Sequence, residues 1–370
     1  MTVLAGFISA ACVLLLYSTL YPVTPLTSAT ELEEEDESDR NVDKSDRDLD
    51  KSTMAQPEPD ELDDNAILGT FYYPWYGHWR QWNIKDHSPP KTWASNYLPD
   101  ILPGKFKPSE ELYNSMNITI VEKHLVWMKR AGIQLGISSW WGQSHYTDDA
   151  FNKIISSDIT NRAYPGFKWS ILYEKEGFED PSIEEIISDL NYIKSKYVSS
   201  THYLKIGGKP VIFVYNAQNT GYIPLDDYDR WKKAKSEAGF YIVFKVDPMA
   251  IGADPSGMDS WYQYAPSKRY DRQGDWSAMV SPGFWKYHEE SPRLERNIKD
   301  FELAVQRLAN ADVQFKLIKT FNEWSEGTGI EPANLINHDD EDGFSMNSLS
   351  YGTQYLDILA KYFKTKGAPP

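Results

Sequence analysis

The chain has 370 residues, 14% of them aromatic, and a formal net charge of −16. Residues 31–64 hold sixteen acidic and four basic residues, a net charge of −12, which leaves −4 on the rest of the chain. From residue 65 onward, a part that we call the body of the chain, lysine and arginine do not cluster in a stripe. This argues against nucleic acid as a ligand, because phosphate binding requires clustered lysine and arginine. The 13 Trp and 24 Tyr residues suit either an aromatic core or faces on which sugar rings stack.

The N-terminal residues 3–23 form an uncharged, mainly apolar run that is long enough to cross a bilayer as a helix. They predict an uncleaved membrane anchor in residues 1–24. The alternative is a signal peptide that is cleaved near the small residues Thr27, Ser28 and Ala29. Residues 25–64 are acidic and almost free of large apolar side chains, which predicts a disordered stem. One glycosylation sequon, Asn117 to Thr119, mildly supports a lumenal body.

In residues 65–370, short β-branched and aromatic runs alternate with longer amphipathic runs, as strands and helices do in βα units. The pattern predicts an α/β fold, a single (β/α)8 TIM barrel. The expected strands are residues 66–73, 133–140, 168–174, 210–216, 241–247, 258–264, 276–281 and 315–323. The expected helices include residues 119–131, 183–197, 228–238, 294–308 and 348–363.

Aromatic and polar residues cluster where several predicted strands end. Since a parallel barrel carries its active site at the carboxyl ends of its strands, these residues are candidates for substrate binding. The candidates are Tyr73, Trp75, Trp140, Trp141, Glu174, Tyr215, Tyr262, Tyr264, Asn322 and Trp324. Their convergence at one face of a barrel predicts a cleft in which sugars stack.

Two glutamates three positions apart, Glu323 and Glu326, follow the last predicted strand. Hydrolysis of a glycosidic bond needs one group that protonates the departing oxygen and another that supplies electrons near the anomeric carbon. A carboxyl pair with separated pKa values can do both. An isolated Glu-x-x-Glu more often caps a helix or pairs with a surface arginine. The position at a strand end and the flanking Asn322 and Trp324 favour the catalytic interpretation.

Other chemistries find little support in the sequence. A phosphate-binding loop and a dinucleotide fingerprint are both missing, and Gly207, Gly208 and Lys209 precede a predicted strand instead of following one. The seven histidines lack the spacing of zinc ligands, and Ser144 followed by His145 lacks the elbow of a nucleophilic serine. We therefore expect neither a metal nor a cofactor.

The segment 320–331, Thr-Phe-Asn-Glu-Trp-Ser-Glu-Gly-Thr-Gly-Ile-Glu, resembles the Asn-Glu-Trp-His-Glu-Gly-Thr-Gln-Ile-Glu motif of glycoside hydrolase family 99, the endo-α-1,2-mannosidases. Five further segments resemble the family and occur in the same order. They are Phe-Tyr-Tyr-Pro-Trp-Tyr-Gly at 71–77, Lys-Pro-Val-Ile-Phe-Val-Tyr at 209–215, Gly-Met-Asp-Ser-Trp-Tyr-Gln-Tyr at 257–264 and Ser-Pro-Gly-Phe at 281–284, together with Ser-Trp-Trp at 139–141.

This resemblance implies a (β/α)8 barrel that cleaves inside an N-glycan or mannan, retains the anomeric configuration and uses no metal. It implies that Glu323 deprotonates the sugar 2-hydroxyl, which attacks the anomeric carbon and forms a 1,2-anhydro sugar. Glu326 then corresponds to the acid that protonates the leaving oxygen. Trp140, Tyr215 and Tyr262 match substrate-contacting aromatics of the family, and Glu174 matches a strand-end site residue more loosely. Golgi members with an N-terminal anchor and stem imply a single-pass type II protein with a lumenal catalytic domain, and the alternative is a secreted protein.

Two positions depart from the motif: Ser325 stands in place of histidine and Gly329 in place of glutamine. They leave the specificity for α-1,2-mannosides open, whereas both glutamates are present. Two other interpretations therefore stay open. The chain is a glycosidase of another α-linked glycan, such as an α-glucan, or it is a carbohydrate-binding barrel without turnover.

Overall fold

The computed structural model describes residues 66–77, 97–99, 113–215, 225–245, 257–286, 289–337 and 345–364. All of them lie within one compact unit, Asp60–Pro370. The predicted anchor and the predicted stem, residues 1–64, fall outside the described residues. Among the helices of the described part, none combines the length and the apolar character that crossing a membrane requires.

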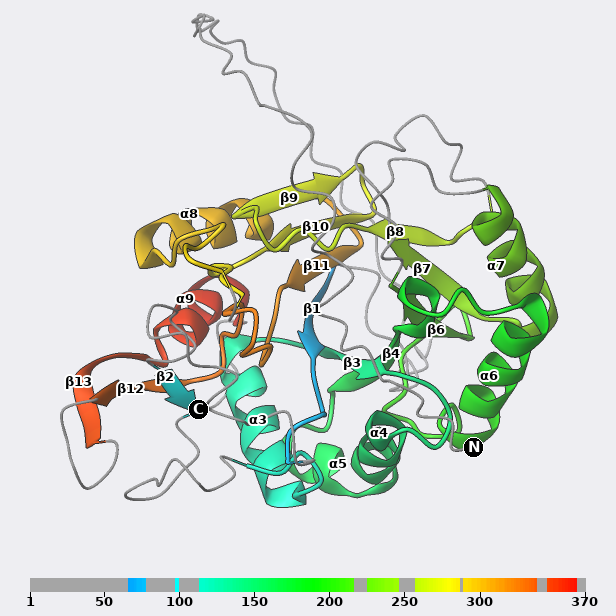
Figure 1. Ribbon diagram of the computed structural model, residues 1–370, viewed down its shortest axis with the longest axis horizontal. Coiled ribbons are helices and arrows are strands. Elements are labelled where there is room, and N and C mark those ends of the chain that lie inside the picture. Colours follow the sequence, from blue (N-terminus) through cyan, green and yellow to red (C-terminus); the bar gives the residue numbers. More distant parts are fainter. Residues whose placement is uncertain are drawn as a thin grey trace, which may run out of the picture. The chain divides into compact units, whose positions relative to one another are not determined.

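Eight parallel strands form the centre of the fold (Figure 1). They are β1 (Ile67–Tyr72), β3 (Leu135–Trp140), β4 (Lys168–Tyr173), β6 (Lys209–Val214), β7 (Tyr241–Lys245), β8 (Ser260–Tyr262), β10 (Ser277–Val280) and β11 (Phe315–Ile318). They follow one another around the sheet in chain order, and β1 pairs in parallel with both β3 and β11. Contact between β8 and β10 completes the ring. All eight predicted strands and the barrel-like α/β architecture are confirmed.

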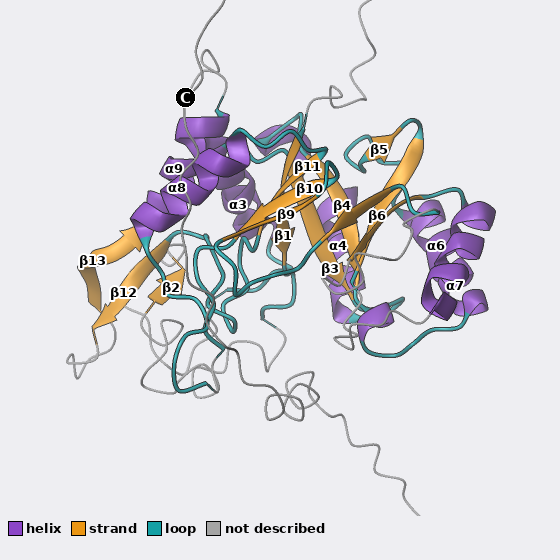
Figure 2. Ribbon diagram, turned by 90° about the horizontal axis from the view of Figure 1, so that it is seen from above, coloured by secondary structure: helices purple, strands orange, loops and turns teal. Residues whose placement is uncertain are grey.

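Helices surround the strands, with α3, α8 and α9 on one side and α6 and α7 on the other (Figure 2). The helices are α3 (Ile118–Ala131), α4 (Tyr146–Ser156), α5 (Ile159–Ala163), α6 (Ile183–Lys196), α7 (Leu225–Ala238), α8 (Ile298–Ala309) and α9 (Gln354–Phe363). Local sequence sets several ends. A capping box of Ser182 and Glu185 begins α6, and Gly132 ends α3 in the left-handed conformation.

Two predicted helices begin too early. Residues 348–352 belong to strand β13 (Ser345–Gly352) and not to the helix that was expected to start at Ser348. Strand β13 pairs with β12 (Ala333–Asn337), which also pairs with β2 (Tyr97–Pro99) to form a separate antiparallel sheet. Leu294 forms an isolated bridge with Phe284, so α8 starts only at Ile298. Both errors arise because these residues pair with another segment of the chain, and helical periodicity does not register such a partner.

Besides β2, β12 and β13, two short strands next to the barrel were not predicted. Strand β5 (Lys205–Ile206) forms a hairpin with β6 through Gly207 and Gly208, both of which have positive φ. Strand β9 (Tyr270–Gln273) runs antiparallel to β10, and the described chain between β8 and β10 contains this strand and no helix.

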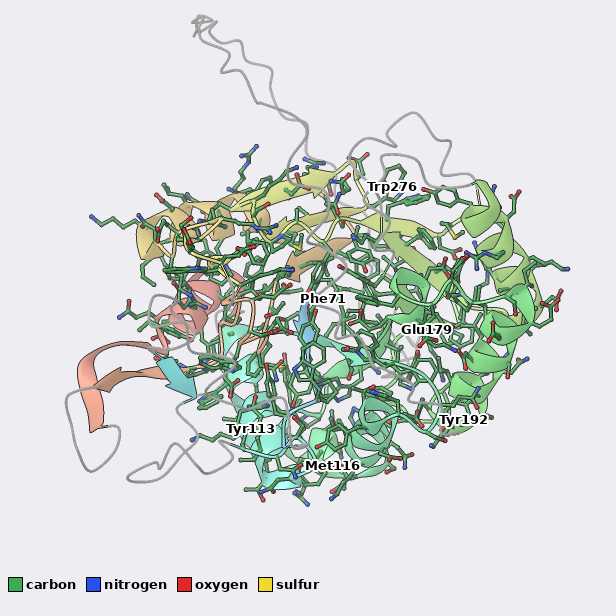
Figure 3. The ribbon with its side chains drawn as sticks, viewed as in Figure 1. Phe71, Tyr113, Met116, Glu179, Tyr192 and Trp276 are labelled. Carbon is green, nitrogen blue, oxygen red and sulfur yellow. The ribbon has the colours of Figure 1, made fainter. Side chains whose placement is uncertain are left out.

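Large aromatic side chains fill the barrel and the layer outside it. Inside, Phe71 lies in the middle of the molecule (Figure 3), with its ring centroid 5.6 Å from that of Tyr262 and 6.5 Å from that of Phe213. Outside, the buried indole of Trp169 packs in the layer between the strands and helices, 4.9 Å from the ring of Phe167. The barrel is therefore a packed core and not a pore, which leaves its strand ends as the place for chemistry.

The close approach of Gly136 to Trp169 gives a test of this packing. A Cβ atom at Gly136 would lie 2.5 Å from the indole of Trp169. Gly166→Ala is the matched control, since no atom lies within 4 Å of a Cβ there. We expect Gly136→Ala to lower the free energy of unfolding by about 1–3 kcal/mol in denaturant titrations, because overpacking displaces a buried ring. Equal stability of the two variants would contradict this packing.

Candidate active site

The segment that follows β11 folds back on itself and holds both predicted catalytic glutamates. Strand β11 ends at Ile318, earlier than the expected residue 323. The Thr320 N–H donates to the Thr328 carbonyl over 2.9 Å, and the Thr320 hydroxyl accepts from the Glu323 N–H over 2.9 Å. These bonds close a compact turn at the carboxyl end of the barrel, and Glu323 and Glu326 both project from it.

Glu323 is buried, with only 3% of its surface exposed. The Ser325 N–H and the Ser325 hydroxyl both donate to its Oε1 atom, the N–H over 3.1 Å. Burial, followed by repulsion from Glu326, raises the pKa of Glu323 to about 8, although Ser325 and Lys319 act in the opposite direction. A carboxyl group with such a pKa carries its proton at neutral pH.

Glu326 has a different environment, and 23% of its side chain is exposed. The Nζ atom of Lys319 lies 3.0 Å from its Oε2, and the Nζ of Lys286 lies 3.4 Å from its Oε1. Burial alone would raise the pKa of Glu326, but Lys319 and then Lys286 outweigh burial and hold this pKa below its ordinary value. The two glutamates therefore differ in charge at neutral pH.

A third buried carboxyl, Glu174, follows β4. Its Oε1 accepts a 2.8 Å hydrogen bond from the Ser139 hydroxyl, which itself accepts from the Trp141 indole over 3.1 Å. Burial raises the pKa of Glu174 to about 8, and the charge of Glu326 raises it further while Ser139 lowers it. Glu174, Glu323 and Glu326 together are called the carboxylate cluster below.

Aromatic side chains from three other strand ends adjoin the carboxylate cluster. The hydroxyls of Tyr73 and Tyr264 share a hydrogen bond, and the Trp75 ring lies 4.6 Å from that of Tyr73. Tyr215 meets Tyr264 edge-on, with ring centroids 5.2 Å apart. Except for the buried Tyr73, these side chains are only partly covered, so a part of each is accessible to a ligand. The structure thus brings together Tyr73, Trp75, Trp141, Glu174, Tyr215, Tyr264, Glu323 and Glu326.

Four other predicted site residues have their side chains engaged in packing and hydrogen bonds within the protein. Trp140 is fully buried on the outer side of β3, where its indole donates to Asp148 over 2.8 Å. Asn322 uses its side chain to bind the backbone of Tyr73, and Tyr262 lies inside the barrel and donates to the Val214 carbonyl. In a strand, successive side chains point to opposite faces, so Trp141 and not Trp140 reaches the carboxylate cluster.

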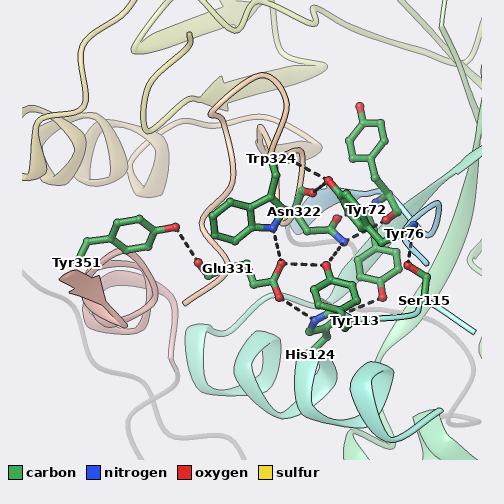
Figure 4. Close-up of polar contacts among 10 residues, drawn as sticks. Tyr72, Tyr76, Tyr113, Ser115, His124, Asn322, Trp324, Glu331 and Tyr351 are labelled. Carbon is green, nitrogen blue, oxygen red and sulfur yellow. Dashed lines mark hydrogen bonds and ion pairs between the residues drawn. The ribbon is translucent and has the colours of Figure 1, made fainter. Parts of the chain in front are cut away.

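Trp324, the fourth of these residues, belongs to a buried polar network (Figure 4). Its indole donates to Glu331 over 2.8 Å, and Glu331 also accepts from Tyr113 over 3.1 Å and contacts His124 over 3.0 Å. Glu331 is completely buried. This network holds the end of the turn against α3 and β1. Trp324 therefore has a structural role.

Several neighbours of the carboxylate cluster were not predicted from the sequence. Lys319, Lys286, Lys245 and Ser139 carry the charges and donors around the carboxyl groups. Phe178 is 42% exposed and lies 4.8 Å from Trp141 and 6.0 Å from Tyr215, measured between ring centroids. Of these neighbours, Lys319 could have been recognised from the sequence, because it lies immediately before the Glu-containing turn and a lysine at the end of a buried strand needs an acidic partner.

In the described part of the chain, three or more His, Cys, Asp or Glu side chains do not gather in a way that could hold a metal ion. The expected absence of a metal and of a cofactor stays a prediction. The arrangement itself provides two neutral carboxyls, one ionised carboxylate and the amino groups of Lys319 and Lys286 beside aromatic side chains. That combination is able to donate a proton at one point and to accept a proton at another.

The raised pKa of Glu174 predicts a specific pH dependence of stability. This pKa rises from the ordinary 4.5 to about 8 on folding, so the contribution of Glu174 to stability is complete below pH 4.5 and is lost as the pH rises through 8. Glu174→Gln stays neutral and retains an acceptor for Ser139. We expect the variant to gain about 2–4 kcal/mol relative to the unmodified chain between pH 5 and pH 8.5.

The measurement is the free energy of unfolding in denaturant at several pH values. Glu184→Gln, at an exposed position of α6, is the control and should follow the unmodified chain at each pH. Parallel pH curves for Glu174→Gln and the unmodified chain would show that Glu174 is ionised in the folded state.

Comparisons with known proteins identify related chains. Residues 62–264 match the model of glycosyl hydrolase family 99, and this match ends before Glu323 and Glu326. The chain is 24% identical over 340 residues to a glycoprotein endo-alpha-1,2-mannosidase-like protein of Mus musculus, covering 75% of this chain and 72% of the relative. It is 20% identical over 376 residues to a glycoprotein endo-alpha-1,2-mannosidase of Rattus norvegicus, covering 84% and 79%.

The fold is also similar to that of a solved GH99 endo-alpha-mannosidase from Bacteroides thetaiotaomicron. The similarity has a TM-score of 0.60 at 19% sequence identity and covers 82% of this chain and 97% of the bacterial one. At this identity the likeness supports the fold alone. Because the family model matches more than half of the 370 residues, the chain belongs to glycosyl hydrolase family 99, and it is a glycoside hydrolase.

Proposed function

We propose that the chain is an endo-acting glycosidase that cleaves α-1,2-mannosidic linkages in N-glycans or mannan. The observation that carries this proposal is the turn after β11, where Glu323 and Glu326 lie at the barrel end with opposite protonation preferences. Acid and base catalysis in glycoside hydrolysis requires such a pair. The mouse and rat relatives, which are named as endo-α-1,2-mannosidase or as a protein like it, support the linkage.

In this proposal the partly covered aromatic faces of Trp75, Trp141, Tyr215 and Tyr264 bind the sugar rings, with Tyr73 hydrogen-bonded behind them. The 2-hydroxyl of the mannose unit attacks its own anomeric carbon while the leaving oxygen takes a proton. The 1,2-anhydro sugar that results is then opened by water with overall retention. An α-mannoside suits this route because its 2-hydroxyl lies trans to the leaving group.

The test replaces each carboxyl in the full-length chain by an amide. We expect Glu323→Gln and Glu326→Gln each to reduce the release of oligosaccharide from a glucosylated high-mannose glycan by about 10²- to 10⁴-fold, because an amide neither donates nor accepts the proton. Thermal unfolding checks that both variants fold, and Glu184→Gln on the exposed face of α6 serves as the control. Full activity of either variant would remove that residue from the proposed mechanism.

The substitution of Ser325 for the motif histidine favours a second substrate class within the same chemistry. Ser325 contacts the catalytic Glu323 directly, so a change at this position alters the surroundings of the reacting sugar. Hydrolysis rates measured on a panel of α-linked mannans and α-glucans distinguish the two substrate classes. If calorimetry detected binding of mannosides and no hydrolysis product formed, the chain would be a carbohydrate-binding barrel without turnover. The presence of both carboxyl groups argues against that outcome.

We also propose that the body lies in the lumen of the secretory pathway, in the Golgi, anchored as a single-pass type II protein by residues 3–23. The alternative is a secreted protein. The apolar run and the sequon at Asn117, which is an exposed N-cap of α3, support this placement. We expect the body to resist protease added outside intact Golgi vesicles and to become sensitive when detergent opens them. Digestion without detergent would place the body on the cytoplasmic side.

A further inference from the structure

Phe178 is an exposed aromatic side chain at the end of the barrel that carries the carboxylate cluster. Among the large apolar side chains of the described residues, those of Val126, Phe178, Trp276 and Leu303 are exposed. Val126 lies on α3, Leu303 lies on α8, and Trp276 comes directly before β10, at the amino end of that strand. Phe178 instead follows the carboxyl end of β4, and a parallel barrel binds its ligands at the carboxyl ends of its strands.

The Phe178 ring contacts two aromatic side chains that adjoin the carboxylate cluster. Its centroid lies 4.8 Å from that of Trp141, with 30° between the ring planes, and 6.0 Å from that of Tyr215, with 17° between the planes. The Trp141 indole donates to Ser139, whose hydroxyl donates to Glu174. Phe178 is the most exposed of the three aromatic residues. The aromatic surface beside the carboxylate cluster therefore continues outward through Phe178.

The backbone that carries Phe178 is anchored although its side chain is exposed. Phe178 follows the short 3₁₀ helix η2 (Lys175–Gly177), whose Glu176 is only 3% exposed. The Glu176 carboxylate accepts from the Trp231 indole over 2.7 Å and pairs with Arg230 over 2.9 Å. Both partners belong to α7, so the segment is fixed against a helix of the barrel. A ring that is already in place costs less entropy when a ligand binds to it.

A second buried carboxylate joins the segment of Phe178 to the segment of Trp141. Asp189 of α6 is buried, and its Oδ2 lies 3.1 Å from the Nζ of Lys175. Its Oδ1 accepts from the Gln143 side chain over 2.8 Å. Lys175 lies just before Phe178 in the chain, and Gln143 lies just after Trp141. Asp189 therefore holds the two aromatic residues at a fixed spacing.

Polar groups border the exposed ring. Glu179, the next residue, is exposed, and its carboxylate lies 3.9 Å from the Nζ of Lys175. A sugar unit has a face of C–H bonds and a rim of hydroxyls, so an aromatic ring with charged neighbours suits it. An isolated exposed ring is common on protein surfaces. Phe178 differs because its ring extends the aromatic surface of the site and its segment is held by two buried carboxylates.

We propose that Phe178 is a specificity-determining residue, and that with Trp141 it forms an additional subsite for a sugar unit of the glycan other than the unit that is cleaved. This inference rests on the proposed function, because it requires a glycan at the barrel end. A contact away from the reacting atoms stabilises the bound substrate and the transition state equally, so it lowers KM and leaves kcat unchanged. The subsite thus favours extended glycans over short ones.

The test measures kcat and KM of the full-length chain on the glucosylated high-mannose glycan. We expect Phe178→Ala to raise KM about 5- to 20-fold, the effect of losing one stacked ring, and to leave kcat within about twofold. Phe178→Tyr keeps the ring and should keep the KM of the unmodified chain. Phe178→Leu is apolar but has no ring, so it should behave like Phe178→Ala, and it gives the same test if Phe178→Ala is unstable.

Trp276→Ala is the matched control, because it removes a similarly exposed aromatic side chain, 40% against 42%, from the amino end of β10. It should change neither kcat nor KM. Thermal unfolding checks that every variant folds. Equal KM values for Phe178→Ala and Trp276→Ala would overturn the subsite, and so would a loss of kcat without a change in KM.

Failure of the subsite and failure of the proposed function are distinguishable. If the unmodified chain releases no oligosaccharide, the proposed hydrolysis is refuted, and calorimetry with the same glycan then tests the subsite. Binding that Phe178→Ala weakens about 5- to 20-fold and Phe178→Tyr retains would support a subsite without turnover. If the unmodified chain does not bind the glycan, both proposals are wrong.

Discussion

The pairing of the first barrel strand with the last one is the constraint on which the site depends. It places the aromatic turn after β1 beside the glutamate turn after β11, although about 250 residues separate them. Asn322 secures the contact, because its side chain accepts from the Tyr73 N–H over 2.8 Å and donates to the Tyr73 carbonyl over 3.1 Å. The residue next to Glu323 thereby fixes the position of an aromatic neighbour of the carboxylate cluster.

Burial at the barrel end explains why charge is distributed so unevenly among the three carboxyl groups. A buried charge is costly without a partner, and two ammonium groups are both directed to Glu326. Glu174 and Glu323 receive neutral hydroxyl or amide donors and keep their protons instead. The same desolvation that would destabilise the fold at high pH is what separates an acid from a base, so stability and chemistry are linked at this end of the barrel.

Most of the barrel could be predicted from the sequence because its strands are short apolar runs bounded by polar turns, a pattern that is local. The elements that were missed depend on pairing with another segment, whether that segment is near or distant in the sequence. Residues 348–352 form a strand because they pair with β12, and residues 97–99 complete that sheet from the other end of the chain. Local helical periodicity does not register such a partner, so tertiary pairing overrides it.

The sequence by itself determined the order of the eight strands, the turn with Glu323 and Glu326, and the family resemblance, because each of these is written in contiguous residues. Only the tertiary structure decided which side chains adjoin the carboxylate cluster. Trp141 faces the carboxylate cluster and Trp140 packs against Asp148, since adjacent strand residues point to opposite sides and only the register selects the inner one. Lys286 reaches Glu326 for a similar reason, because the closed barrel brings the segment after β10 against the turn after β11.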